Sequence, residues 1–139
     1  MPSKDEHIGN LRHNYAFLKE CETKCDAKTT YPDWLFIVRF YVCVHIVEAI
    51  LATKGIHSER HADRSTKISR LKDLFRDDFE IHYRDLLNAS YLARYTTKIR
   101  KNMKPDILQD NEKSFNYIVN YAKDKFGITV DEPISTPTS

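Results

Sequence analysis

The sequence predicts an all-α protein that folds as an antiparallel up-and-down bundle of about five helices. Only three of its 139 residues are glycine, whereas leucine, alanine, lysine, glutamate and arginine are plentiful. No stretch shows the sustained alternation of apolar and polar residues between turn residues that is typical of strands. A chain of this length suits one domain, and we expect that domain to cover residues 1–128.

The first two predicted helices cover residues 5–26 and 33–54, where the hydrophobic pattern is helical. The second is apolar nearly all round, so we expect it at the centre of the bundle. Pro32 favours its start, because proline suits the first helical turn, and Gly55 favours its end in a left-handed cap. Charged and polar residues interrupt its apolar run, which predicts a core helix and no membrane span.

Three further helices are predicted in the second half of the chain. One covers residues 58–75 with Ser58 as its N-cap, and the next covers residues 79–101. The last follows a break at Pro105 and ends near residue 126. Residues 129–139 are rich in proline, serine and threonine, so we expect a disordered tail.

The composition of the chain also excludes some classes of protein. A net charge of +2 argues against a bulk polycation that coats nucleic acid, although it leaves room for a local basic patch. Cys21, Cys25 and Cys43 are odd in number and lack metal-type spacing, which favours reduced thiols in a cytoplasmic protein. The amino terminus shows no hydrophobic signal region. No glycine-rich phosphate loop or dinucleotide fingerprint is present, and we expect no cofactor.

A polar cluster is expected inside the bundle. The second helix carries a tyrosine, a histidine and a glutamate on one stripe of an otherwise apolar run. Burying a histidine and a carboxylate is costly unless each finds a partner. The stripes of the next two helices supply a histidine and two arginines that point inward. The expected cluster consists of Tyr41, His45, Glu48, His61, Arg64 and Arg94.

Two interpretations of this cluster remain open. It can hold an anionic ligand such as a nucleotide or RNA, with arginine contacting phosphate and histidine donating a hydrogen bond or moving a proton. Alternatively, Glu48 pairs with Arg64 or Arg94 and the network only fixes the register of the helices. The second interpretation describes a non-catalytic helical interaction module.

Arg76 and His82 form a second candidate site. Residues six apart in an unbroken helix point about 120° away from each other. If Asp77 and Asp78 break the helix, the two side chains can meet. His82 would then move a proton and Arg76 would stabilise the charge of a phosphorane, which is the chemistry of RNA cleavage.

Two weaker patterns concern metal and phosphate. His57 and His61 lie one turn apart and His45 can join them, which would make a metal-binding bundle. Because His57 falls in a predicted break, we expect no metal site. The basic run of Lys98, Arg100, Lys101 and Lys104 has no acid within it and predicts either a phosphate-facing strip or a solvated helix end.

Several of these residues together resemble the HEPN (higher eukaryotes and prokaryotes nucleotide-binding) superfamily over about residues 33–95. The matching pattern comprises Tyr41, His45, Glu48, Ala49 and Leu51, then Gly55 and His61, then Leu86, Leu87, Ala93, Arg94 and Tyr95. The resemblance implies a helical bundle that forms homodimers and associates with RNA or nucleotide. Many members are toxins paired with a small nucleotidyltransferase antitoxin.

Many catalytic members of that superfamily are metal-independent ribonucleases, and their arginine and histidine lie four to six residues apart. Arg76 and His82 match this spacing, and Asp77 takes the polar place after the arginine. In those members the motif opens the final long helix, whereas here another predicted helix follows. We therefore expect a cytoplasmic, dimeric protein that associates with RNA or nucleotide and has no membrane partner. Whether it is also a metal-independent ribonuclease stays open at this point, and the position of the motif argues against it.

Overall fold

The computed structural model describes residues 2–24, 31–95 and 105–131, and these residues form five helices and no strand. The prediction of an all-α bundle of about five helices is therefore confirmed. The helices are α1 (Lys4–Lys24), α3 (Pro32–Ala52), α4 (His61–Arg70), α5 (Phe79–Tyr95) and α7 (Pro105–Phe126).

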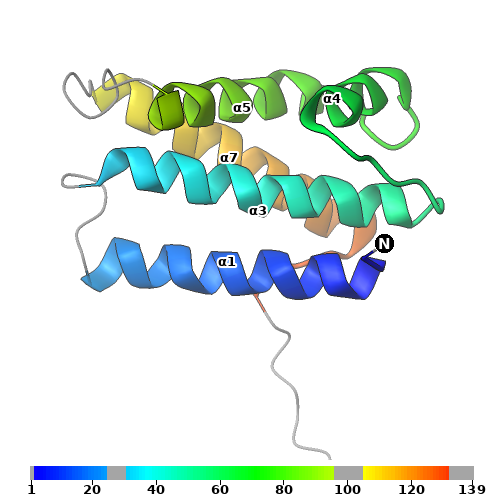
Figure 1. The fold of residues 1–139 in the computed structure, drawn as a ribbon, viewed down its shortest axis with the longest axis horizontal. Coiled ribbons are helices and arrows are strands. Elements are labelled where there is room, and N and C mark those ends of the chain that lie inside the picture. Colours follow the sequence, from blue (N-terminus) through cyan, green and yellow to red (C-terminus); the bar gives the residue numbers. More distant parts are fainter. Residues whose placement is uncertain (1, 25–30, 96–104, 132–139) are drawn as a thin grey trace, which may run out of the picture.

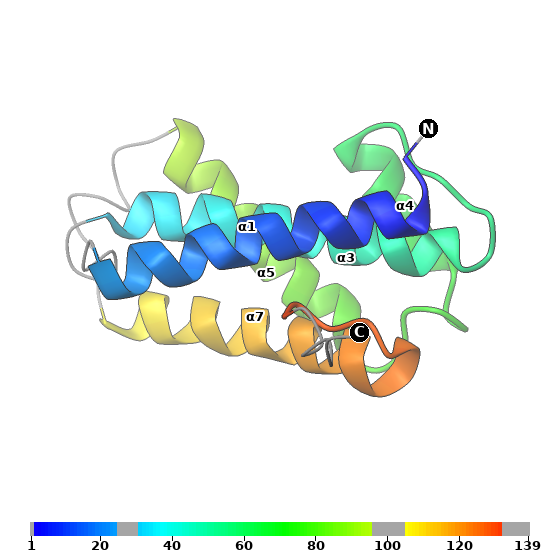
Figure 2. The ribbon, with the colours of Figure 1, turned by 90° about the horizontal axis from the view of Figure 1, so that it is seen from below.

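Helix α3 occupies the centre of the bundle and packs against α1, α5 and α7. Figure 1 shows α1 and α3 side by side and running in opposite directions, with α5 on the other side of α3. In the view from below, α5 crosses α3 obliquely (Figure 2). The short helix α4 lies at the end of the bundle where α1 begins and α3 ends (Figures 1 and 2).

The sequence of α3 explains its central place. Its apolar residues cover nearly the whole circumference, and Leu35, Phe40 and Ile50 have almost no exposed surface. Pro32 occupies the first helical turn, as predicted. At the other end Gly55 has a positive φ of 68°, and the Ile56 amide donates to the Leu51 carbonyl, which closes a Schellman motif.

Among the described residues, α3 is the one helix long and apolar enough to cross a membrane, with a mean hydropathy of 2.1 in its most apolar window. In the bundle, 72% of that window is buried. Core helices of soluble proteins and membrane spans both pass this test. The cytoplasmic location and the absence of a membrane partner therefore remain predictions.

Helix α4 is shorter than the sequence predicts. It begins at His61, because Ser58 is not its N-cap but donates its hydroxyl to Glu48. It ends at Arg70, and residues 71–78 form turns in place of a continued helix. The hydroxyl of Tyr121 stabilises these turns by donating to the Leu74 carbonyl at 2.7 Å.

Two other predicted boundaries reach beyond the described part of the chain. The ends of the predicted helices 5–26 and 79–101 pass Lys24 and Tyr95, where the described segments stop. The expected tail begins at residue 129, and residues 132–139 lie outside the described residues. Thr129 itself still contacts α1, because Arg12 donates to its carbonyl at 3.1 Å and to its hydroxyl at 3.2 Å.

Candidate functional site

Glu48 is the centre of a polar cluster at the end of the bundle where α4 lies. Only 3% of this residue is exposed, so its charge needs close partners. Its Oε1 accepts a hydrogen bond from Arg64 Nε at 2.8 Å and another from the Ser58 hydroxyl. The Ser58 amide faces Oε2 at 3.4 Å. Of the two partners expected for Glu48, the structure therefore pairs it with Arg64.

Arg64 also contacts His61, one turn earlier on α4. Its Nη1 lies 2.9 Å from His61 Nδ1. Because a guanidinium has no acceptor, His61 Nδ1 accepts and the histidine proton is on Nε2. Partial burial and the charges of Arg64 and Arg94 lower the pKa of His61, which favours this neutral form. The side chain of His61 is exposed rather than inward-pointing as the sequence predicts.

A histidine pair joins α1 to α3 next to this network. The Nδ1 atoms of His7 and His45 lie 3.2 Å apart, and their ring centroids are separated by 5.5 Å. Burial lowers the pKa of both histidines, and nearby positive charges contribute to the shift at His45. His7 was not anticipated from the sequence, because only the packing of α1 against α3 brings it to this end of the bundle.

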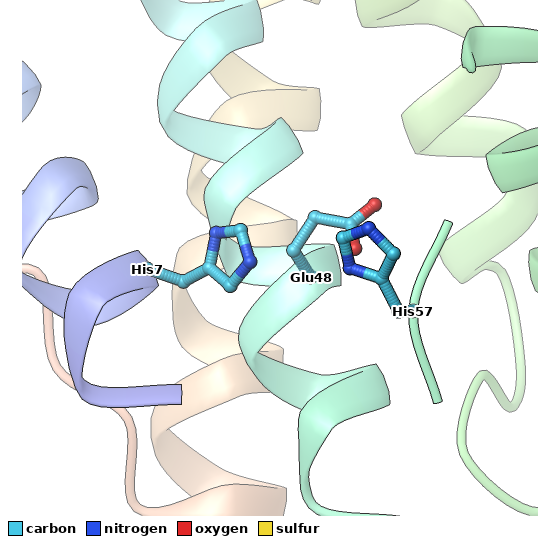
Figure 3. Close-up of side chains that lie close together, drawn as sticks. All are labelled: His7, Glu48 and His57. Atoms are coloured by element: carbon cyan, nitrogen blue, oxygen red, sulfur yellow. The ribbon is translucent and has the colours of Figure 1, made fainter. Parts of the chain in front are cut away.

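His7 and Glu48 also approach His57, which lies between α3 and α4. Ligand atoms of these three side chains all lie within 4.8 Å of one another. Figure 3 shows the two rings approaching the carboxylate from opposite sides, one from α1 and one from the connection after α3. In the described part of the chain this is the one group of three side chains that are close enough to bind a metal together. The set of His45, His57 and His61, which the sequence offered as a metal site, is not brought together.

A cavity of about 210 Å³ borders this trio. His7, Glu48 and His57 contribute to its wall together with residues 2–4 and the turn at Gly55. The trio therefore has space for a small ligand beside it. We call the buried and half-buried polar residues of this region the inner cluster, which consists of His7, His45, Glu48, His57, Ser58 and Arg64.

Tyr41 and Arg94 do not enter the inner cluster. Tyr41 is 36% exposed, because its neighbour Phe40 takes the inward position on α3. The guanidinium carbon of Arg94 lies 6.0 Å from the Phe40 ring centroid, and its Nε donates to the Ser90 carbonyl at 3.3 Å. His61 approaches the same ring, with the centroids 5.6 Å apart.

The predicted polar cluster is thus divided into two halves that meet at the contact between Arg64 and His61. The outer half includes two more exposed tyrosines of α5, whose ring centroids lie 4.9 Å apart. Arg94 links them to Phe40, because its guanidinium carbon also lies 5.4 Å from the Tyr95 ring. We call this half the Phe40 rim, which consists of Tyr41, His61, Tyr91, Arg94 and Tyr95.

The second candidate site consists of Arg76 and His82, which form hydrogen bonds to different residues of α7. The chain breaks between Arg76 and His82 as required, because Asp77 has a φ of 57° and α5 begins at Phe79. However, His82 Nδ1 lies 2.9 Å from the Ser114 hydroxyl and its ring stacks on Tyr117 with centroids 4.2 Å apart.

Arg76 is exposed, and its hydrogen bond to the bundle comes from its backbone amide, which donates to the Tyr121 hydroxyl at 2.9 Å. Among the described residues, no hydrogen bond joins the side chains of Arg76 and His82. The predicted basic run of Lys98, Arg100, Lys101 and Lys104 lies outside the described residues.

An apolar groove is present between α1 and the start of α3, away from the polar end. Its volume is about 370 Å³, and almost all of its lining is apolar. Phe17 and Trp34 border it and are 52% and 59% exposed. The full lining comprises Phe17, Leu18, Cys21, Tyr31, Trp34, Leu35 and Val38.

Comparison with known proteins found no matching family model, no matching curated protein and no matching solved structure. Membership of the HEPN superfamily therefore remains a prediction from the residues.

Proposed function

We propose that this chain is a HEPN-like protein that binds RNA or a nucleotide through the Phe40 rim. The observation that carries the proposal is the position of Arg94 and His61 around Phe40, next to exposed tyrosine rings. Cationic side chains contact phosphate, and exposed aromatic rings stack on unpaired bases. The rim supplies both kinds of contact on one surface.

The hydrogen bonding of the rim supports a role in binding. Arg94 uses Nε for the Ser90 carbonyl, so its two terminal nitrogens remain able to contact a phosphate. His61 accepts from Arg64 through Nδ1 and can donate through Nε2. In the sequence, the basic run that starts at Lys98 follows Tyr95 closely, so this part of the chain carries further positive charge.

We propose binding without cleavage. A general acid or base must reach the proton that it transfers, and His82 is already engaged by Ser114 and Tyr117. Arg76, its predicted partner, belongs to the turn before α5 and is exposed.

The proposal is tested by fluorescence anisotropy with labelled single-stranded RNA and labelled ATP. Arg94→Ala should weaken RNA binding at least about tenfold, because a charge-assisted phosphate contact contributes about 1.5–3 kcal/mol. Tyr95→Ala should weaken it by the loss of one stacked base, about 1–3 kcal/mol. Arg84→Ala is the matched control, because Arg84 is an exposed arginine of α5 outside the rim that pairs with Glu80.

Wild-type protein that binds neither ligand would overturn the proposal. So would an equal loss in Arg84→Ala and Arg94→Ala, because that result would indicate binding by overall charge alone.

A second candidate function is a helical interaction module, and the apolar groove favours it. Contiguous exposed apolar surface commonly marks a protein interface, and aromatic residues are enriched at the centres of interfaces. We propose a second copy of this chain as the occupant, in agreement with the homodimer that the HEPN resemblance implies. A nucleotidyltransferase antitoxin is the other partner that the resemblance implies.

The polar cluster is also compatible with an interaction module. The pairing of Glu48 with Arg64 and Ser58 orders α4 without any ligand.

A further inference from the structure

We propose that His7, Glu48 and His57 bind one transition-metal ion of the Zn²⁺, Co²⁺ or Ni²⁺ class, with an open coordination position toward the neighbouring cavity. Two imidazoles and one carboxylate are a ligand set that zinc uses in proteins. Ligands of a tetrahedral zinc ion lie about 3.4 Å apart when each bond is about 2.1 Å. The ligand atoms of the three side chains lie within 4.8 Å of one another. Side-chain rotations that move these atoms by about 1 Å would bring them to the spacing of zinc ligands.

His7 is oriented for this role by His45. Its Nδ1 contacts His45 Nδ1 at 3.2 Å, which leaves Nε2 as the nitrogen available to a metal. Metal-binding histidines almost always donate their other ring N–H to a neighbouring acceptor, and His45 Nδ1 takes that role in the tautomer that carries its proton on Nε2. His45 is therefore a positioning residue. Burial favours the neutral form of His7, which is the form that binds a metal.

Glu48 has one oxygen left for the ion. Its Oε1 accepts from Arg64 and from the Ser58 hydroxyl, whereas within the described ranges of the chain Oε2 accepts one long hydrogen bond, from the Ser58 amide at 3.4 Å. The carboxylate is thus expected to bind through Oε2 alone. Arg64 neutralises part of its charge, so the site depends on imidazole nitrogen. This dependence selects borderline metals over Mg²⁺ and Ca²⁺, which prefer shells of oxygen ligands.

His57 is held near the ion by the connection between α3 and α4. The Schellman motif at Gly55 turns the chain, and Lys67 Nζ then donates to the His57 carbonyl. Lys67 is itself fixed by an ion pair with Asp63 at 2.9 Å. The His57 ring is half-buried and borders the cavity of about 210 Å³. This cavity leaves space for water or another small ligand in the fourth position.

The inference does not rest on the proposed function, because metal binding at the inner cluster needs no RNA. It is tested by isothermal titration of the metal-free full chain with Zn²⁺, and by the visible absorption of the protein after addition of Co²⁺. We expect one ion per chain. His57→Ala should lower the affinity at least about a hundredfold, because it removes a direct ligand. His45→Ala should lower it by about 10–100-fold, as expected for a residue that orients a ligand.

His13→Ala is the matched control, because His13 lies on α1 but is exposed and outside the inner cluster. It should retain the wild-type affinity and the Co²⁺ spectrum. Circular dichroism of each variant checks that the helices are intact, and the half-buried His57 is the ligand whose removal least disturbs the core. The proposal is overturned if wild-type protein binds neither ion, if His57→Ala binds like wild type, or if His13→Ala loses affinity to the same extent.

Discussion

The Nδ1 atoms of His7 and His45 lie 3.2 Å apart and connect α1 to α3. One of these nitrogens must donate a proton and the other must accept it, so the contact requires at least one neutral imidazole. If each ring carried a proton on both nitrogens, two N–H donors and two positive charges would face each other. We therefore expect the packing of α1 at this end of the bundle to be sensitive to pH.

We expect the metal-free protein to become less stable as the pH falls. Burial lowers the pKa of His7 and of His45 in the folded state, so the unfolded chain binds protons more readily. The free energy of unfolding should be greatest above the ordinary histidine pKa of about 6.5 and should decrease as the pH falls through the folded-state values. Urea denaturation in EDTA at about pH 7.5 and about pH 5 measures this change. His45→Asn should reduce the pH dependence, whereas His13→Asn should not; equal slopes in all three proteins would contradict the explanation.

The ion pair of Glu48 and Arg64 should give strongly non-additive mutations. Removing either partner leaves the other buried without compensation, which costs about 3–5 kcal/mol. Replacing both with methionine should cost much less than the sum of the single losses, because no buried charge remains. Urea denaturation of the two single variants and the double variant measures the coupling. Additive losses would show that the two side chains act independently.

Tyr121→Phe should destabilise the protein by about 1–3 kcal/mol. The ring of Tyr121 stays buried, but the Leu74 carbonyl and the Arg76 amide lose their partner. The amide of Arg76 should then exchange its hydrogen faster, which NMR measures together with the loss of stability. Tyr117→Phe is the control, because its hydroxyl accepts from the exposed Asp78 amide at 3.2 Å. A loss as large for Tyr117→Phe would contradict a special role for Tyr121.

The protein should leave single-stranded RNA intact. His82 contacts Ser114 and Tyr117, and Arg76 is exposed on the preceding turn. Gel electrophoresis of labelled RNA after incubation with the protein tests this expectation. Cleavage by wild type that disappears in His82→Ala and in Arg76→Ala would show that the predicted pair is catalytic after all.

Trp34→Ser should weaken self-association. Trp34 borders the apolar groove and is 59% exposed, so its replacement removes interface area without opening the core. Ile81→Ser is the control, because Ile81 is 57% exposed on α5 and does not line the groove. Light scattering after gel filtration measures the molar mass. A monomeric wild-type protein, or a dimer that survives in Trp34→Ser, would exclude the groove as the dimer interface.

The fold was largely predictable because helical periodicity is a local property. The apolar circumference of α3 predicts its central position, and Pro32 and Gly55 predict its two ends without any tertiary contact. The end of α4 was not predictable in this way. The Tyr121 hydroxyl donates to the Leu74 carbonyl and accepts from the Arg76 amide, and it belongs to a helix more than 40 residues later in the chain.

The candidate site was predictable only in part for the same reason. The stripe of α3 predicted that Glu48 needs a partner, and Arg64 is that partner. His7 could not be found, since its approach to Glu48 depends on how α1 packs against α3. Tyr41 and His61 were expected to point inward, but Phe40 occupies the inward position between them.

The connection that follows Gly55 carries two of the groups that meet Glu48, the Ser58 hydroxyl and the His57 ring. Its length therefore decides which groups reach that carboxylate in addition to Arg64. One added residue after Gly55 would move both groups while leaving every helix its own sequence. The chemistry of the polar end therefore depends on the length of a single short link as much as on the helices that the link joins.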